Sequence, residues 1–548
     1  MPENKEDKNN AEIAAGIIKE FERLRSERGN FETHWKEIAE RIWPNQKNLF
    51  QQHGSLSSPG EKRTQELYDS TAAIALNRFG AILDSLLTPR NQTWHRTMPS
   101  DKNLLKDRET KLWFEDLNRA LFKYRYAPKA NFASQNQQNY KSLGAYGTGC
   151  VFIDKLAGDT GIRYRNLHLG EIYFVENHQG IVDKALRYFP LTVRQAHQKW
   201  GDKLPDRLKS ILAVNPETNF YFIHCVKPRE DVDYERADYK GMSYASYYIS
   251  VEGQAFLEEG GYAVFPYAIS RYEQVPGEVY GRGPAMDVLP AIKTLNEQKK
   301  IVLKQGHRAT DPVLLVHDDG ILDTFSLKPG AMNAGGVTAD GRPLVHTLPI
   351  GRVDIGKDLM DDERAVINDA FLITIFQILT DSPTMTATEV LERTKEKGIL
   401  LAPTIGRQQS EYLGPLIERE IDILMSQGLI PRMPDALIEA KGEYRIEYDS
   451  PLSRAQRAEE AAGIARTMET ALRAIEVTQN PEPLDHFNWD AIIPEIADIQ
   501  GVPASWMRSA EEVKALREGR AEQQQTQEII QGAPAAAAMI KATAAAQK

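Results

Sequence analysis

The fold of this chain is decided by RYEQVPGEVYGRGPAMDVLPAIKTLNEQKK, residues 271–300. The run begins extended, broken by Pro and Gly, and continues with apolar residues at helical spacing. A strand-like insert at 313–353 follows, and a second helical pattern runs from Asp354 to about Leu379. At about 1.5 Å per residue, each helix is about 35–40 Å long, too long to pack within so small an insert. The pattern therefore predicts a helical hairpin that projects from the body.

The two predicted hairpin helices carry opposite charge. The first, Met286–Arg308, is basic, and the first half of the second is acidic. Opposite charges on two surfaces of one chain suit packing beside further copies of that chain. We therefore expect contacts between subunits at Lys293, Lys299, Lys300, Asp361, Asp362 and Glu363.

The body that precedes the hairpin is predicted to be α+β. Residues 1–10 are polar and charged, and we expect them to be disordered. Apolar residues at helical spacing then predict helices over Ala11–Trp43, with a break at Gly29, and over Tyr68–Leu87. Two further helical stretches lie between residues 108 and 146.

From Val151 to Ile269 the chain is rich in alternating and aromatic segments separated by turn residues. One helix, about Val193–Trp200, interrupts them. This pattern predicts a mostly antiparallel sheet. Gly144, Gly147 and Gly149 precede the first strand, where a nucleotide-binding loop would follow one, so they predict a tight helix-to-strand turn.

The chain after the hairpin is predicted to be mainly helical. TDSPTMT, residues 380–386, is a loop, and a long helix follows that Gly398 and Pro403 kink and Gly428 ends. A short strand, EYRIEYDSP, precedes an Ala/Arg/Glu-rich helix from Ser453 to about Thr478. Shorter helices follow at 481–518, with breaks expected at Pro494 and Pro503. The Gln/Ala-rich end is a frayed helix or a disordered tail, and composition does not choose between them.

Composition excludes several classes of protein. The 548 residues carry a net charge of −10, which argues against a protein that grips nucleic acid with its whole surface. No apolar run reaches the roughly 18 residues that span a bilayer, and the N-terminus lacks the pattern of a secretory signal. The two cysteines, Cys150 and Cys225, lie in apolar surroundings and are expected to be buried free thiols.

The chemistry of an enzyme has little support in the sequence. Phosphate-loop, zinc-protease, nucleophile-elbow and paired CxxC motifs are all missing. Consecutive acids on one helix point in different directions, so the DDER cluster at 361–364 is expected to be a solvated or inter-subunit face. We therefore expect no catalytic, cofactor-binding or metal-binding residues. The alternative is an acidic-site nucleic-acid-processing enzyme that uses Asp361 and Asp362, and a repeat scaffold is excluded because no period recurs.

The 271–300 run resembles the signature of the head-to-tail connector, or portal, proteins of short-tailed bacteriophages. MTATEVLERTKEKGILLAPTIGRQQSEYLGPLIEREIDILMSQGLIP, residues 385–431, resembles the same family. So do FERLRSERGNFETHWKEIAERIWP, residues 21–44, and LYDSTAAIALNRFGAILDSLLTPRNQTWH, residues 67–95. The similarity spans roughly residues 15–450, and the C-terminal hundred residues match only in being helical and Ala/Gln-rich.

The resemblance implies a ring, commonly of twelve subunits, at one capsid vertex, through which double-stranded DNA enters and leaves. It implies the following parts: a wing of N-terminal helices and antiparallel sheet at 1–284, a first stem helix at 285–310, a clip at 311–353, a second stem helix at 354–379, a tunnel loop at 380–388, a kinked wing helix with a return strand at 389–452, a crown at 453–520 and a Gln/Ala-rich tail, frayed helix or disordered, at 521–548.

The resemblance also implies partners and contact residues. The clip would dock the terminase and then the tail adaptor, through His317, Asp318, Asp319, Lys328, Arg342 and His346. The tunnel loop would meet the moving DNA with Thr380, Asp381, Ser382, Pro383, Thr384, Met385 and Thr386. Major capsid and internal core or ejection proteins would be further partners, without membrane contact by this chain. The ring would assemble in the host cytoplasm and reside at the portal vertex of the virion. Which face of the stem lines the channel stays open.

Overall fold

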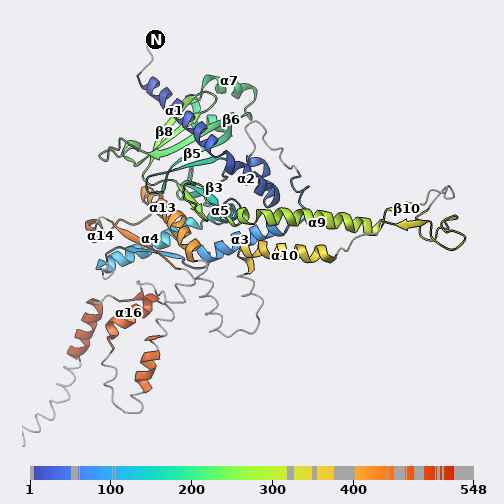
Figure 1. Ribbon diagram of the computed structural model, residues 1–548. Coiled ribbons are helices and arrows are strands. Elements are labelled where there is room, and N and C mark those ends of the chain that lie inside the picture. Colours follow the sequence, from blue (N-terminus) through green and yellow to red (C-terminus); the bar gives the residue numbers. More distant parts are fainter. Residues whose placement is uncertain are drawn as a thin grey trace, which may run out of the picture. The chain divides into compact units, whose positions relative to one another are not determined.

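The computed structural model describes most of the chain up to residue 449 and shorter stretches beyond it. The described residues are 5–50, 60, 62–101, 103–104, 107–316, 326–348, 354–374, 402–440, 442–449, 463–464, 466–473, 487–499, 502, 506–508 and 511–523. The chain divides into two compact units: residues 1–90 with 125–427, and residues 91–124 with 428–548. The first unit contains the three- and five-stranded sheets and the hairpin (Figure 1).

Three helices open the first unit. They are α1 (Lys5–Glu27), α2 (Gly29–Arg41) and α3 (Thr71–Leu87), with a 3₁₀ turn, η1, at Pro44–Phe50. The predicted break at Gly29 and the helix ending at Leu87 are confirmed. The expectation of disorder across residues 1–10 is wrong from Lys5 onward. Ala14, Ile17 and Phe21 bury one face of α1 against a sheet, and this packing supports the helix upstream.

A tight turn joins α5 (Phe132–Tyr146) to the first sheet, as predicted. Gly147 ends the helix with φ 72°, a left-handed conformation that glycine adopts without steric cost. Strand β2 (Thr148–Lys155) follows directly and lies between β3 (Ile162–Leu167) and β9 (Tyr267–Arg271), antiparallel to both.

The second sheet has five antiparallel strands in sequence order, which confirms the prediction of a mostly antiparallel body. They are β4 (Ile172–Glu176), β5 (Val182–Thr192), β6 (Asn219–Pro228), β7 (Tyr244–Ser250) and β8 (Ala255–Tyr262). Alternation along β6 fills both faces: Ile223 and Cys225 pack under α1, and Phe220 and Phe222 pack on the opposite face. Both cysteines are buried and free, as expected.

The helix expected between these strands is confirmed as α6 (Val193–Trp200), but a second helix was missed. After the short turn η3 (Gly201–Lys203), α7 (Asp206–Val214) places Leu208 in the same apolar cluster as Trp200. A further 3₁₀ turn, η4 (Tyr239–Gly241), lies between β6 and β7.

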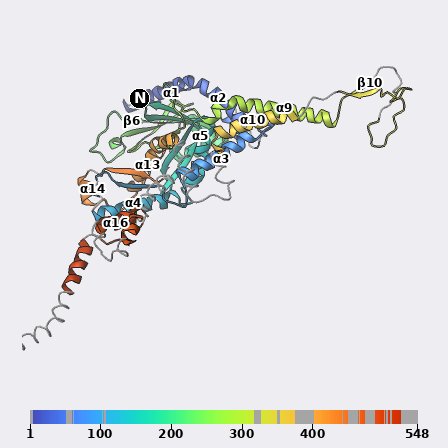
Figure 2. The same ribbon diagram turned by 60° about the horizontal axis from the view of Figure 1, so that its bottom comes forward.

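The predicted hairpin is present, and in both ribbon views it extends away from the sheets with its strands at the far end (Figures 1 and 2). It comprises α8 (Pro284–Asp287), α9 (Leu289–Thr310), the paired strands β10 (Leu314–Val316) and β11 (Val345–Thr347), and α10 (Asp354–Ala370). The second helix was predicted to continue to about Leu379; an unbroken helix of that length is wrong, and residues 375–379 lie outside the described residues. It stops at Ala370 because Leu372 turns to φ 61°, a conformation that no α-helix accommodates.

The chain returns to the body as a helix from residue 402, with one π-helical turn, η5 (Gln408–Leu413), before α13 (Gly414–Ser426). Gly428, at φ 67°, follows its end as predicted. Kinks were expected at Gly398 and Pro403. Among the described residues the helix departs from regular α-helical geometry at this π turn, which lies beyond Pro403. Gly398 lies outside the described residues.

The second unit is built around a two-stranded antiparallel sheet of β1 (His95–Pro99) and β12 (Tyr444–Tyr448). Its helices are α4 (Arg108–Arg125), α14 (Asp435–Glu439) and α16 (Trp489–Ile499). The expected break at Pro494 is wrong, because α16 continues through it. Pro503 lies outside the described residues. In the helix expected from Ser453 to about Thr478, the described residues 463–464 and 466–473 are helical.

Candidate functional site

The hairpin is anchored to the first unit by its proximal half. Leu289, Ile292 and Leu295 are the buried residues of α9, and all lie in its first two turns. On the second hairpin helix, α10, Ile367 is fully buried near the C-terminal end. Just beyond that end the Phe371 ring packs edge-on against Phe79 of α3, with the centroids 5.9 Å apart. The apolar packing that holds the hairpin to the body is thus confined to its root.

The distal hairpin, residues 296–348, lacks a core of its own among its described residues. None of those residues is buried. Two short strands are marginal alone, so a hairpin of this kind gains stability only by packing against something else. The large apolar side chains that it exposes are Ile301, Leu303, Val313, Leu315, Val316, Leu327, Met332, Val337 and Leu348.

A strap, residues 66–69, ties the two hairpin helices together near their root. The Asn296 side chain of α9 accepts hydrogen bonds from the Tyr68 and Asp69 amides, at 2.8 and 3.3 Å, and donates to the Glu66 carbonyl at 3.0 Å. Arg364 of α10 donates to the Asp69 carboxylate at 2.7 Å. Burial raises the pKa of Asp69, but hydrogen bonds from Thr71 and Arg364 outweigh it and leave the pKa below its ordinary value.

The helices also approach closely at Gly356 of α10. A Cβ at this position would lie 2.7 Å from the Val302 Cγ2 atom of α9, closer than carbon atoms in proteins come. Glycine therefore sets the separation of the two helices at this level.

Three of the residues expected at subunit contacts have partners inside the chain. Lys293 Nζ lies 2.5 Å from the Glu37 carboxylate of α2. Lys300 pairs with Glu297 on its own helix at 3.3 Å, and Asp361 pairs with Arg364 at 2.7 Å. These groups stabilise the root and the helices of one protomer.

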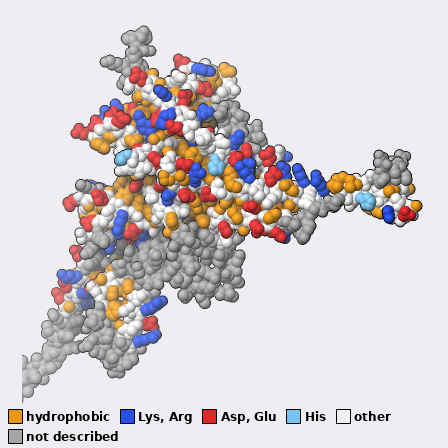
Figure 3. Space-filling model, in the orientation of Figure 1, with side chains coloured by type: hydrophobic (Ala, Val, Ile, Leu, Met, Phe, Trp, Pro, Cys, Tyr) orange, Lys and Arg blue, Asp and Glu red, His pale blue; other side chains and the backbone are white. Residues whose placement is uncertain are grey.

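Other charges of the hairpin have no ionic partner among the described side chains. Over the described side chains, no ion pair joins α9 to α10, and Lys299, Asp362 and Glu363 have no ionic partner. Lys304 and Asp358 likewise have no ionic partner among the described side chains. Figure 3 shows basic side chains along distal α9 and acidic ones along α10. The hairpin therefore displays a basic and an acidic surface that do not neutralise each other.

The expected clip residues are exposed where the structure describes them. His346 lies in β11, opposite Leu315 of β10, and Lys328 and Arg342 lie in the turns between the strands. His317, Asp318 and Asp319 lie outside the described residues. So do all seven residues expected in the tunnel loop, 380–386.

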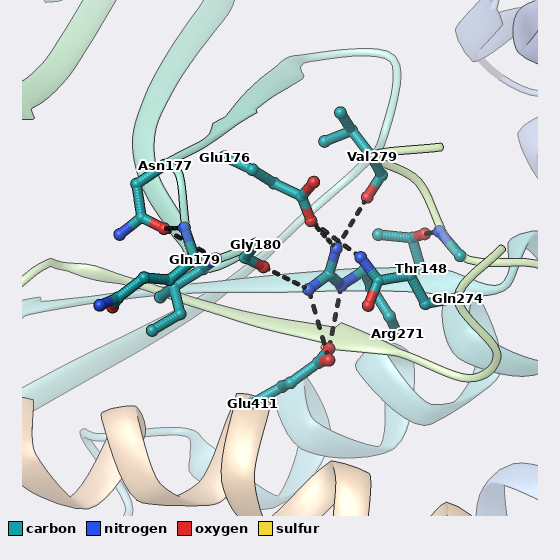
Figure 4. A network of polar contacts seen from close by, with 11 residues as sticks. Thr148, Glu176, Asn177, Gln179, Gly180, Arg271, Gln274, Val279 and Glu411 are labelled. Carbon is teal, nitrogen blue, oxygen red and sulfur yellow. Dashed lines mark hydrogen bonds and ion pairs between the residues drawn. The ribbon is translucent and has the colours of Figure 1, made fainter. Parts of the chain in front are cut away.

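A polar network at the root of the hairpin was not anticipated from the sequence (Figure 4). Its centre is Arg271, the last residue of β9. The guanidinium donates two hydrogen bonds to Glu411 of the π turn, at 3.0 and 3.3 Å, and one to Glu176 at the end of β4. It also donates to the Val279 carbonyl at 3.2 Å and to the Gly180 carbonyl at 3.4 Å.

The network is largely buried. The Arg271 side chain is 4% exposed, and those of Glu176 and Glu411 are 20% and 24% exposed. Burial lowers the pKa of Arg271, but its bonds to Glu411 and Glu176 raise it by more, so the pKa lies above its ordinary value. A forked cation held by two carboxylates is a fixed joint, because the planar group matches its partners in one geometry only.

Sequence reasoning placed Arg271 at the start of the decisive stretch but gave it no role. Its main partner, Glu411, lies 140 residues away in the chain. A buried arginine at a strand end predicts that carboxylates must lie nearby, yet nothing in the pattern says which ones.

The described residues hold no group of three or more His, Cys, Asp or Glu side chains arranged to bind a metal ion. Their helices likewise include none of the length and apolarity needed to cross a bilayer. The adjacent acids Asp361 and Asp362 are exposed, and Asp361 already forms an ion pair with Arg364. This geometry gives the nuclease-like alternative no support.

Comparison with known proteins identifies the family of this chain. Residues 14–507 match the family described as "Bacteriophage head to tail connecting protein". The chain belongs to this family. The connector match extends well beyond residue 450, where the resemblance in the sequence ended.

Two relatives of the connector are similar over almost its full length. The "Portal protein" of Salmonella phage epsilon15 is 27% identical over 531 residues, which cover 95% of this chain and 93% of that protein. The "Probable portal protein" of Bordetella phage BPP-1 is 28% identical over 534 residues, covering 95% of this chain and 94% of that protein.

Proposed function

We propose that this connector is a portal protein: copies form a ring at one capsid vertex, and double-stranded DNA passes through the ring during packaging and ejection. Family membership and the names of two relatives that match almost end to end support the portal role. The single structural observation that carries the ring is the distal hairpin, because it exposes apolar residues and unpaired charges that only another molecule can cover.

A neighbouring copy fits these surfaces better than an unrelated protein does. In a closed ring each copy meets the next through two different surfaces, so one chain must carry both complementary halves. The hairpin carries both kinds of group: the basic Lys299 and Lys304 on α9, and the acidic Asp358 and Asp362 with Leu359 on α10. We assign the contacts between stems to these groups rather than to Lys300 and Asp361, which have partners on their own helices.

The finer parts of the proposal follow the family's plan. The ring has twelve copies, the stem at 285–310 and 354–379 surrounds the channel, and the clip at 311–353 docks the terminase and then the tail adaptor. Residues 380–388 form a tunnel loop with only one charge, Asp381, so it has no cation to hold phosphate. The crown faces the capsid interior, with its major capsid and internal core partners, in a virion assembled in the host cytoplasm. A net charge of −10 suits a channel that conducts DNA without retaining it.

Electron microscopy of the purified chain tests the ring. Negative-stain class averages are expected to show rings with a central hole, and only monomers or irregular particles would refute the proposal. Incubation with double-stranded DNA and Mg²⁺ is expected to leave the DNA intact, and cleavage that persists through repurification would favour an enzyme.

A charge-swap experiment tests the assigned contact. Lys299→Glu with Lys304→Glu is expected to reduce ring yield strongly, because acidic then faces acidic at every interface. Adding Asp358→Lys with Asp362→Lys is expected to restore the rings. Each exposed pair contributes only about 0.2–1 kcal/mol, so the effect depends on repetition around the ring. Failure of the second pair of substitutions to rescue assembly would refute this assignment while leaving the ring itself untouched.

A further inference from the structure

The chain leaves the sheet body for the hairpin directly after Arg271. The outgoing run, residues 272–283, links β9 to α8. The next described segment after the hairpin begins with the returning helix, from residue 402 through the π turn η5. The hairpin keeps its angle to the body only if the run that leads into it is fixed to the body.

One guanidinium contacts both the outgoing run and the returning helix. Arg271 donates to the Val279 carbonyl of the outgoing run and grips Glu411 of the returning helix with two bonds. Its own carbonyl accepts a hydrogen bond from the Gln408 side chain at 2.8 Å, also from the returning helix. The third arm reaches Glu176, at the end of a strand of the five-stranded sheet, which Gln274 of the outgoing run also binds at 3.0 Å. We call Arg271, Glu176 and Glu411 the clamp.

The outgoing run has no slack on its other side. The Gly281 amide donates to the Thr148 hydroxyl at 2.8 Å, and the Tyr272 amide donates to the Gly147 carbonyl at 2.9 Å. A Cβ on Gly147 would lie 2.3 Å from the Arg282 carbonyl carbon, so the two backbones are already in contact. The clamp thus completes a junction in which hydrogen bonds and close backbone contacts join the outgoing run, the returning helix and the sheets.

We propose that the clamp sets the angle between hairpin and body, and through it the number of copies that close the ring. This inference rests on the proposed ring. Closure requires that the rotation from one copy to the next divide a full turn evenly, and about 2–3° separates rings of eleven, twelve and thirteen copies. A rotation that small is within the freedom that a flexible, singly bonded cation would allow and that a two-bonded arginine denies.

The test counts the copies per ring by native mass spectrometry. Arg271→Lys keeps the charge but cannot grip Glu411 with two bonds, and Glu411→Gln keeps the shape but removes the charge. Both variants are expected to give at least two ring sizes, with a tenth or more of the rings differing from the main wild-type size. Glu176→Gln is expected to broaden the distribution less, because Arg271 makes one bond to Glu176 and two to Glu411.

Arg229→Lys is the matched control. The Arg229 side chain is 3% exposed and pairs at 2.8 Å with Glu259, which is 26% exposed, so its burial nearly equals that of the clamp. It joins two parts of the sheet and contacts neither the outgoing run nor the returning helix. The control is expected to lower the melting temperature as much as Arg271→Lys does while leaving the ring size unchanged. A lower melting temperature alone is what a purely structural role would produce.

The outcomes separate the inference from the proposed function. Folded Arg271→Lys and Glu411→Gln rings with the wild-type size distribution would overturn the inference alone, as would an equally broad distribution for Arg229→Lys. Should Arg271→Lys not fold, the isosteric Glu411→Gln variant decides. A wild-type chain that forms no ring would overturn the proposed function, and the role of the clamp in closure with it.

Discussion

The two ends of the hairpin follow opposite principles of construction. At the root, charged groups are buried and paired, glycines bring backbones into contact, and apolar side chains fill the space between elements. At the distal end no described residue is buried, and Lys299 and Lys304 have no ionic partner among the described side chains. The root is packed within one protomer, whereas in the proposed ring the distal end is covered by other copies. Stability of the single chain is therefore expected to depend on the root, and assembly on the distal end.

The largest effect on the unassembled chain is expected from Glu420→Ala, in the body near the root. Glu420 forms a fully buried ion pair with Arg125, whose Nε atom lies 2.9 Å from one carboxylate oxygen, and accepts a 2.5 Å bond from the Tyr164 hydroxyl. Removing one partner strands a buried charge and costs about 3–5 kcal/mol. Urea unfolding of the dilute chain measures this loss.

Glu297→Ala provides the control for that experiment. Glu297 pairs with Lys300 but is mostly exposed, so its removal is expected to change the free energy of unfolding by less than about 0.5 kcal/mol. A comparable cost for both substitutions would remove the contrast between buried body and exposed hairpin.

The next effect is expected from Gly147→Ala at the junction. At φ 72° a non-glycine residue costs about 1–3 kcal/mol from backbone strain, and collision with the backbone of residues 281–283 adds to it. Gly158→Ala isolates the strain, because Gly158 has φ 75° but nothing within 4 Å of its Cβ position. The difference in unfolding free energy between the two variants measures the close approach itself. Equal values would mean that the outgoing run shifts away at no cost.

How far the sequence predicted this architecture follows from the range of the interactions involved. The break at Gly29, the turn at Gly147 and the two hairpin helices depend on neighbouring residues, and all were predicted. The end of α10 at Ala370 was not, because the residues beyond it keep a helical apolar pattern while the backbone at Leu372 turns away to bring Phe371 onto Phe79.

The candidate site divides in the same way. Opposite charge on the two helices was visible in the sequence, yet Lys293 finds Glu37 and Asp361 finds Arg364 only in the folded chain. The clamp joins residues up to 235 positions apart, counting from Glu176 to Glu411, and no local pattern encodes such a meeting. Distant partners of buried charges are the part of this fold that periodicity leaves undetermined.

A smaller effect is expected from the strap. Asn296→Ala removes three hydrogen bonds that are partly open to solvent, which is expected to cost about 1 kcal/mol. The strap is also sensitive to acid. Because the folded pKa of Asp69 lies below its ordinary value of 3.8, its contribution is complete above that pH and is lost as the pH falls through the folded value.

Hydrogen exchange of the Tyr68 and Asp69 amides measures both effects. Faster exchange is expected in Asn296→Ala at neutral pH, and in the wild type as the pH falls below 3.8 and through the folded pKa of Asp69, after correction for the intrinsic rate. Asp69→Asn should abolish the acid dependence. Its persistence in that variant would assign the transition to another carboxylate.

The smallest effect on the single chain is expected where the effect on assembly is greatest. Ile301→Ser with Leu303→Ser changes two exposed residues of the distal hairpin, so the unfolding free energy of the dilute chain should move by less than about 0.5 kcal/mol. Ring yield should nevertheless fall, because in the proposed ring these side chains are buried between copies. Val214→Ser is the control, since Val214 is 85% exposed on the body and lies outside the hairpin. If Val214→Ser lowers ring yield equally, or if Ile301 and Leu303 prove necessary for the dilute chain to fold, then the distal end is not completed by its neighbours.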